Sequence, residues 1–269
     1  MAMLDLRRED LSSDGLLLPH RESKPRTRGL TMMIDNGLPT ALFADVLAST
    51  SRYVDLVKFG WGTALVTHDL PRKLRLLADQ GIDFLFGGTL FEKYVAQARF
   101  GAFRQLCRRH GCRYVEVSNG TIELDDRAKA GFIGELAAEF TVLAEVGLKD
   151  SGRSARMEPA DWVSSIRSDL QAGARLVILE ARESGSSGIC NADGSVRERL
   201  LDHIVASGIQ LDRLLFEAPT RTLQVYLVKR FGTGVNLGNI AASDLISLET
   251  LRLGLRADTL FVVDQDARP

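Results

Sequence analysis

The sequence has few of the residues that build disulfide frameworks or thiolate-bound metal centres. Three cysteines occur, Cys107, Cys112 and Cys190, and neither their number nor their spacing fits a disulfide scaffold or a zinc site. The four histidines fall in the N-terminal stretch or in expected loops and helices, which argues against a zinc centre and a Ser-His-Asp triad. Free thiols favour a reducing compartment, so we expect a cytoplasmic protein.

An excess of one charge and a long apolar run are also missing. The chain has 34 basic and 35 acidic residues, for a formal net charge of -1, which argues against nucleic acid or an anionic membrane as partner. No run reaches the roughly 18 apolar residues that a membrane span needs. The apolar stretch Leu16–Leu18 is too short for a secretory signal. Locally placed cations remain suited to a small anion.

What is present is a repeat of about 30 residues, the size of one βα unit. Each unit starts with a short, nearly continuous apolar run, which is typical of strands buried on both faces of a parallel sheet. The runs are Leu30–Asp35, Tyr53–Lys58, Phe84–Phe86, Tyr114–Ser118, Val142–Val146, Leu176–Glu180, Leu214–Glu217 and Val235–Leu237. Amphipathic stretches follow several of them, namely Leu70–Asp79, Ala130–Phe140, Val196–Ala206 and Leu223–Phe231.

The repeat predicts an α/β protein, a single-domain (β/α)₈ TIM barrel over residues 29–269. An open doubly wound sheet is the structural alternative, but no GxGxxG pattern follows the first run. Residues 1–28 form an N-terminal arm that we expect to be mobile or to face an oligomer partner. The polar segments Leu148–Met157 and Glu183–Gly194 are expected to be loops that act as lids.

Acidic residues interrupt or close five of the apolar runs. Barrel active sites lie at the carboxyl ends of the strands, and ionisable groups there are costly unless they are paired or bind a metal. Salt bridges that tie the strand ends together are the structural alternative, although the number of ionisable groups favours a catalytic site. Because oxygen ligands suit Mg²⁺, a subset of the five acids is the expected metal site: Asp35, Glu116, Glu145, Glu180 and Glu217.

Cations, glycines and amides occupy other strand ends. Glycine-rich turns bring backbone N–H groups close to an oxyanion, and the last strand with its following turn is the usual phosphate region of a barrel. The expected substrate-binding residues are Lys58, Gly87, Gly88, Arg182, Asn236, Gly238 and Asn239. We therefore expect a small anionic substrate.

Several motifs together resemble one known family. They are RGLTMMIDNGL (28–38), VDLVKFGWGT (54–63), GGTLFE (87–92), AEVGLKD (144–150), VILEARESG (177–185), FEAP (216–219), VNLGNI (235–240) and ISLETLRLGLRADT (246–259). In content and order they resemble phosphosulfolactate synthase, from about Arg28 to Thr259. The resemblance implies a (β/α)₈ barrel, a homo-oligomer, and a Mg²⁺-dependent carbon-sulfur lyase that adds sulfite to C3 of phosphoenolpyruvate. The product would be 2-phospho-3-sulfolactate, a precursor in coenzyme M biosynthesis in some microbes.

The resemblance also implies roles for individual residues. Lys149 corresponds to the favoured acid that protonates C2, with Glu145 and Arg182 as its catalytic companions. A lysine in this role needs a pKa that is lowered toward the operating pH. Lys58 and Arg182 would bind phosphate or carboxylate, and acids holding a divalent cation would stabilise the charge that develops on the substrate.

The chain departs from the family pattern at several strand ends. Asn36 and Leu148 stand where the family usually has lysine, Asn119 stands in place of aspartate, and Phe86 in place of proline. Losing two cations would weaken the binding of a dianionic nucleophile such as sulfite. Two alternatives therefore stay open: a family member that adds another nucleophile to phosphoenolpyruvate or a related enol phosphate, and a non-catalytic barrel protein.

Overall fold

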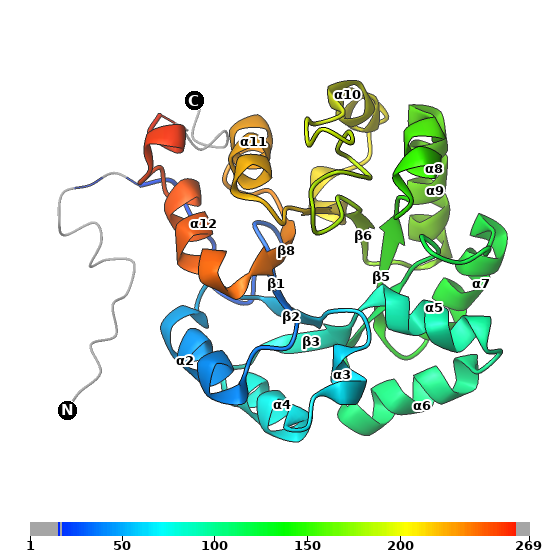
Figure 1. Ribbon diagram of the computed structural model, residues 1–269. Helices are drawn as coiled ribbons and strands as arrows, with labels where there is room; N and C mark the ends of the chain where they lie inside the picture. Colours follow the sequence, from blue (N-terminus) through cyan, green and yellow to red (C-terminus); the bar gives the residue numbers. More distant parts are fainter. Residues whose placement is uncertain (1–15, 17, 262–269) are drawn as a thin grey trace.

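The computed structural model describes residues 16 and 18–261, and these form the predicted (β/α)₈ barrel (Figure 1). All strand pairs are parallel, and the hydrogen-bonded order is β3-β2-β1-β8-β7-β6-β5-β4. In the described chain no ladder joins β3 to β4, so the barrel is nearly closed and has one seam. The strands are β1 (Thr31–Asp35), β2 (Leu56–Phe59), β3 (Asp83–Phe86), β4 (Tyr114–Val117), β5 (Thr141–Val146), β6 (Leu176–Leu179), β7 (Leu214–Glu217) and β8 (Leu237–Ala241).

Helices surround the strands, as Figure 1 shows. They are α2 (Thr40–Thr50), α3 (Thr63–Val66), α4 (Leu70–Asp79), α5 (Gly88–Ala96), α6 (Phe100–His110), α7 (Asp126–Ala137), α8 (Ser151–Arg156), α9 (Pro159–Ala172), α10 (Glu198–Ala206), α11 (Arg221–Phe231) and α12 (Leu245–Arg252), with 3₁₀ turns η1 (Leu211–Arg213), η2 (Ala242–Asp244) and η3 (Ala257–Thr259). Local signals set their ends. Helix α9 begins at Pro159 behind a capping box between Glu158 and Asp161, and it ends at the left-handed Gly173.

Two segments differ from the expectation. The last strand covers Leu237–Ala241 and begins two residues later than Val235; before it, the Asn236 side chain donates to the carbonyls of Asp212 and Leu214. The expected loop Leu148–Met157 contains the short helix α8, whose first turn is capped by the Asp150 carboxylate accepting from the Arg153 backbone N–H.

Side chains alternate along each strand between the barrel interior and the surrounding helices. The interior holds an apolar cluster made of Met32, Leu56, Leu85, Leu143, Leu176, Ile178 and Leu215. A larger apolar cluster lies between the sheet and the helices. In five strands, β2, β4, β5, β6 and β7, an inward-facing residue is followed two positions later by a buried charged residue. These charged residues are Lys58, Glu116, Glu145, Glu180 and Glu217. The alternation thus places a charged layer above an apolar floor.

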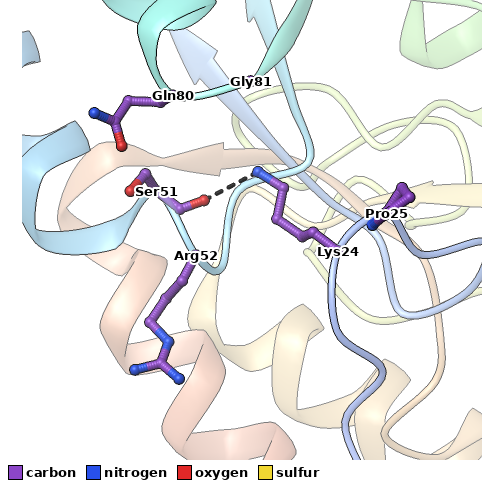
Figure 2. A pocket seen from close by; sticks show the side chains of 6 residues that line it. All are labelled: Lys24, Pro25, Ser51, Arg52, Gln80 and Gly81. Atoms are coloured by element: carbon purple, nitrogen blue, oxygen red, sulfur yellow. Dashed lines mark hydrogen bonds between the residues drawn. The ribbon is translucent and has the colours of Figure 1, made fainter. Parts of the chain in front are cut away.

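The described part of the N-terminal arm binds the end of the barrel at which the strands begin. Arg21 forms an ion pair with Glu249 at 2.8 Å, and Arg26 forms one with Asp55, just before β2, at 2.8 Å. Lys24 reaches the carbonyl of Ser51 beside a cavity of about 350 Å³ (Figure 2). The prediction of a mobile or oligomer-facing arm concerns residues 1–15 and 17 as well, and these lie outside the described residues.

Within the described part of the chain, no helix has both the length and the apolar character needed to cross a membrane.

Candidate active site

Four buried glutamates face one another at the carboxyl ends of the strands: Glu116, Glu145, Glu180 and Glu217. We call them the carboxylate cluster. Lys58 of β2 reaches into the cluster, and its Nζ lies 3.0 Å from Glu116 Oε2, 3.3 Å from Glu217 Oε1 and 3.8 Å from Glu145 Oε2. The structure therefore brings together four of the five acids that were expected to bind metal, with a lysine among them.

Burial and mutual charge shift the pKa values of these groups in different directions. Burial disfavours the charged form of Lys58, but Glu116, Glu217 and Glu145 outweigh it and raise its pKa well above the usual range. Burial raises the pKa of Glu116 to about 7. For Glu180, burial and the carboxylates of Glu217 and Glu145 raise the pKa well above the usual range. Two of the four carboxyls thus take up a proton more readily than a free glutamate does, because burial and neighbouring carboxylates outweigh the attraction of the lysines.

The donor set of the cluster fits a hard divalent cation. In the described chain, Glu145, Glu180 and Glu217 each offer an oxygen within 4.8 Å of the others. Next to the cluster, Asn239 Oδ1 is buried and accepts no hydrogen bond. A bound cation would give such a buried oxygen a partner and would offset the mutual repulsion of the carboxylates. Carboxylate and amide oxygens are the ligands that Mg²⁺ takes.

Lys149 lies beside the cluster and is held at its tip. Its Nζ is 3.5 Å from Glu145 Oε1 and donates to Thr89 Oγ1 at 3.0 Å. Burial opposes the charge of Lys149, but the carboxylates of Glu145 and Glu180 outweigh it and raise its pKa above the usual value. The lowered pKa expected for a proton donor is therefore not found in this arrangement. For Glu145, burial raises the pKa, but Lys149 and Lys58 outweigh it and lower the pKa to about 2.

Arg182 joins the two loops at the mouth of the site. Its backbone N–H donates to Glu180 Oε1 at 2.5 Å, and its guanidinium donates to the carbonyl of Lys149 at 3.0 Å. The side chain is exposed. Arg182 thus adds a positive charge at the entrance, while its backbone orients a cluster carboxylate.

A cavity of about 310 Å³ opens between these groups. The carboxylate cluster lines it together with five other predicted site residues: Lys58, Gly88, Lys149, Arg182 and Asn239. Trp61, Thr89, Thr121 and Glu183 also line it. The sequence prediction missed those four, which lie a few positions after strand ends.

Backbone strain is concentrated in this cavity wall. Trp61, Arg182 and Asn239 have positive φ angles of 47°, 54° and 55°. Ala98 is the remaining non-glycine residue with positive φ in the described chain. Such conformations cost free energy and tend to cluster at functional sites, so their position independently supports this cavity as the active site.

Asp35 does not join the cluster, which corrects the expected ligand set. Its carboxylate forms a 2.6 Å ion pair with Lys73 of α4 and accepts from the backbone N–H groups of Gly37 and Leu38, both at 2.8 Å. The reason is alternation along β1. Met32 faces the barrel interior and Ile34 lines the cavity, so Asp35 points outward to the helices.

Three predicted substrate-binding residues also lie outside the cavity lining. Asn236 sits at the opposite end of β8, and its amide binds the Asp212 and Leu214 carbonyls. Gly238 is packed in the interior, where a Cβ would lie 2.3 Å from Leu215 Cδ2. Gly87 is a close-packed turn residue whose N–H donates to the Phe59 carbonyl. The corrections for Asn236 and Gly238 follow from the later start of β8.

Comparisons with known proteins identify the family. A family model described as (2R)-phospho-3-sulfolactate synthase (ComA) matches residues 19–258. The chain is 49% identical over 247 residues to phosphosulfolactate synthase of Bacillus subtilis (strain 168), which covers 92% of this chain and 98% of that protein. It is 41% identical over 250 residues to phosphosulfolactate synthase of Methanothermobacter thermautotrophicus, covering 91% of this chain and 96% of that protein.

Among solved structures, the YdjI aldolase from Escherichia coli K12 superimposes with a TM-score of 0.53 at 9% identity, covering 84% of this chain and 81% of that one. At that identity the likeness shows the barrel fold alone. The family model and the relatives extend over nearly the whole chain and confirm the resemblance found in the motifs. The chain therefore belongs to the phosphosulfolactate synthase family.

Proposed function

We propose that the protein joins sulfite to C3 of phosphoenolpyruvate in a Mg²⁺-dependent reaction that gives 2-phospho-3-sulfolactate. The observation that carries the proposal is the arrangement of one small cavity, where a carboxylate cluster that fits a divalent cation lies beside Lys149 and Arg182. Family membership makes phosphoenolpyruvate and sulfite the substrates to test first. Both are small anions, which suits the lysines and arginine of the cavity wall.

The chemistry needs charge stabilisation and one proton. The sulfur lone pair of sulfite attacks C3, the C2–C3 π electrons move toward the substrate carboxylate, and C2 then takes a proton. A divalent cation held by Glu145, Glu180 and Glu217 would supply positive charge next to the carboxylate that gains electrons. Arg182 and Lys58 are the remaining cations that can bind phosphate or carboxylate oxygens.

Lys149 is the proposed donor of the proton to C2. Its raised pKa keeps it protonated, and Thr89 Oγ1 fixes the direction of its ammonium. A high pKa makes an amine a weak acid, but a carbanion beside a carboxylate is a much stronger base. The carboxylates that raise the pKa, Glu145 and Glu180, are also proposed cation ligands, so their neutralisation by a cation lowers it again.

The positions of the departures from the family pattern favour sulfite over another nucleophile. Asn36, Asn119 and Leu148 are not among the residues that line the cavity. The Asn119 amide points away from it, donating to the Leu124 carbonyl and to Asp126. Lys58, Lys149 and Arg182 do line the cavity, so three cations are present there to bind small anions.

The test is to incubate the purified protein with phosphoenolpyruvate, sulfite and Mg²⁺ and to follow the product by phosphorus NMR and mass spectrometry. We expect phosphosulfolactate, and a loss of rate of about 10²- to 10⁴-fold for Lys149→Met, the range that general acids contribute. Lys93→Met on the exposed face of α5 is the matched control and should keep the wild-type rate. Turnover with another nucleophile but not with sulfite would overturn the proposal, and so would an unaffected Lys149→Met protein.

A further inference from the structure

The seam between β3 and β4 is bridged by side chains instead of a backbone ladder. Glu116 Oε1 on β4 accepts from the backbone N–H of Gly88 at the start of α5, at 2.8 Å. Glu92, also on α5, is 1% exposed, and its Oε1 accepts from Ser118 Oγ at 2.8 Å and from the Thr121 backbone N–H at 3.3 Å. Helix α5 and the loop after β4 are therefore joined through Glu92.

These two elements hold Lys149 at its two ends. The backbone N–H of Lys149 donates to the Gly120 carbonyl at 3.3 Å, and a Cβ on Gly120 would lie 3.5 Å from Lys149 Cγ. The ammonium donates to Thr89 Oγ1, one residue after Gly88 in the first turn of α5. One support belongs to the loop after β4, and the other belongs to α5. The distance between the supports sets where the ammonium lies.

Glu92 is the side chain that connects the two supports. Its bonds to Ser118 and Thr121 flank Gly120, and its own helix carries Thr89. Gly88, Thr89, Thr121 and Lys149 line the cavity, whereas Glu92 does not. Glu92 thus lies behind the wall and contacts the elements that form it.

We propose that Glu92 is a positioning residue that keeps the loop after β4 and the first turn of α5 at the separation Lys149 needs. The role deepens the proposed function and rests on it in one respect, because Lys149 is taken as the proton donor. Glu92 Oε1 keeps the two elements at this separation by accepting the hydrogen bonds from Ser118 and Thr121. The consequence is that Glu92 controls turnover more than substrate binding, since it contacts no substrate.

The experiment compares Glu92→Gln, Glu92→Ala and the neighbouring control Lys93→Gln, with Mg²⁺ present. For Glu92→Ala we expect kcat to fall about 10- to 100-fold while KM stays within about threefold, the size of effect that a misplaced catalytic group produces. Glu92→Gln keeps a carbonyl acceptor and should recover kcat to within about fivefold of wild type. Lys93→Gln should leave both constants unchanged.

A second readout needs no turnover. Acetylation of Lys149 by acetic anhydride at fixed pH, measured by mass spectrometry, reports on the accessible neutral amine. It should be severalfold faster in Glu92→Ala than in Glu92→Gln, because both variants remove the charge that raises the pKa of Lys149 and only Glu92→Ala removes the acceptor that holds the two supports. If the wild type shows no turnover with sulfite and phosphoenolpyruvate, the proposed function fails while the acetylation rates still decide the role of Glu92. If Glu92→Ala does not fold, Ser118→Ala takes its place and should show the same changes with smaller size.

The positioning role is overturned if folded Glu92→Ala matches wild type in kcat and Glu92→Gln in the acetylation rate. It is overturned equally if Glu92→Gln is as impaired as Glu92→Ala, since the acceptor would then not be what matters. A change in KM with unchanged kcat would also contradict it.

Discussion

Gly88 is a residue at which a single missing atom shapes the site. A Cβ there would lie 2.4 Å from Ser118 Oγ and 2.6 Å from Glu116 Oε1, closer than real Cβ atoms come to polar atoms. The N–H of Gly88 also donates to Glu116. The role found for this glycine is thus to give the carboxylate a donor at close approach, rather than to bind substrate through its own N–H.

At the scale of single residues, we predict a loss of activity for one glycine-to-alanine change and a gain in stability for another. Gly88→Ala should lower kcat/KM about 10- to 100-fold, because Glu116 and Ser118 must move and the site loses its geometry. Gly101→Ala in α6 has open space around the new Cβ and should stabilise the protein by about 0.5–1 kcal/mol through helix propensity. Steady-state kinetics and urea unfolding measure the two. An active, unperturbed Gly88→Ala protein would show that the contacts described for Gly88 do not control the site.

At the scale of elements, the two loops above the cavity are joined to each other. The guanidinium of Arg197 donates to the carbonyls of Ser154 and Met157 in one loop and of Gly188 in the other, at 3.0–3.1 Å. Ser154 Oγ in turn accepts from the Gly188 backbone N–H at 3.1 Å. The loops that were expected to act as lids are therefore tied to each other through Arg197 and Ser154.

Removing this tie should loosen both loops at once. In Arg197→Met three carbonyls lose their donor, and each lost partner costs about 1–3 kcal/mol of local stability when the group stays buried. We expect backbone hydrogen exchange to become at least about tenfold faster in residues 148–157 and 183–194 together. Mass-spectrometric exchange is the measurement, with the exposed Arg199→Met as control. Faster exchange in one loop alone would contradict the coupling.

At the scale of the whole molecule, the barrel carries a charged layer on an apolar floor. The interior cluster that contains Leu56, Leu143 and Leu215 lies beneath Lys58, Glu145 and Glu217. Buried carboxylates of one sign destabilise the fold unless their charge is neutralised. Stability and cation binding should therefore be linked in this protein.

We predict that Mg²⁺ stabilises the fold, and more so at pH 8 than at pH 6. The pKa of Glu116 is raised to about 7, and that of Glu180 well above its usual range, so the protonated fraction of both carboxyls is larger at pH 6 than at pH 8. A cation must displace those protons, so its binding strengthens as pH rises. At 100 times the dissociation constant the gain is about 2.7 kcal/mol. Thermal melts with and without Mg²⁺ measure it.

Two variants test whether the Mg²⁺ effect arises at the carboxylate cluster. Glu180→Gln should lose most of the Mg²⁺ effect, because one of the three grouped oxygen donors becomes a neutral amide. Glu135→Gln removes an exposed carboxylate on α7 and should keep the full effect. A gain that is equal at both pH values, or larger at pH 6, would rule out proton competition at the cluster.

The features that could be predicted from the sequence are those that depend on residues close together in the chain. The apolar runs and helix signals act over a few neighbouring residues, so β7 and α4 appeared with their observed bounds. The acids that interrupt or close the apolar runs, namely Glu116, Glu145, Glu180 and Glu217, were expected at strand ends that parallel topology brings together. The motifs indicated the family. These features needed no knowledge of contacts between distant residues.

Other features depend on contacts across the barrel. Asp35 also closes an apolar run, but its inward or outward direction depends on the register of β1 beside its neighbours, and the outward side offers Lys73. Asn236 and Gly238 lie outside the cavity lining because β8 begins two residues later than predicted. The raised pKa of Lys149 and the connecting role of Glu92 arise from carboxylates and loops supplied by other strands.

The sequence by itself thus determined the βα repeat, the family and the residue types at the strand ends, because these depend on local pattern. Only the tertiary structure decided which acids share one cavity and which lysine stands among them. It also decided what supports Lys149, because charge and hydrogen bonding between distant residues depend on distances that barrel closure alone sets.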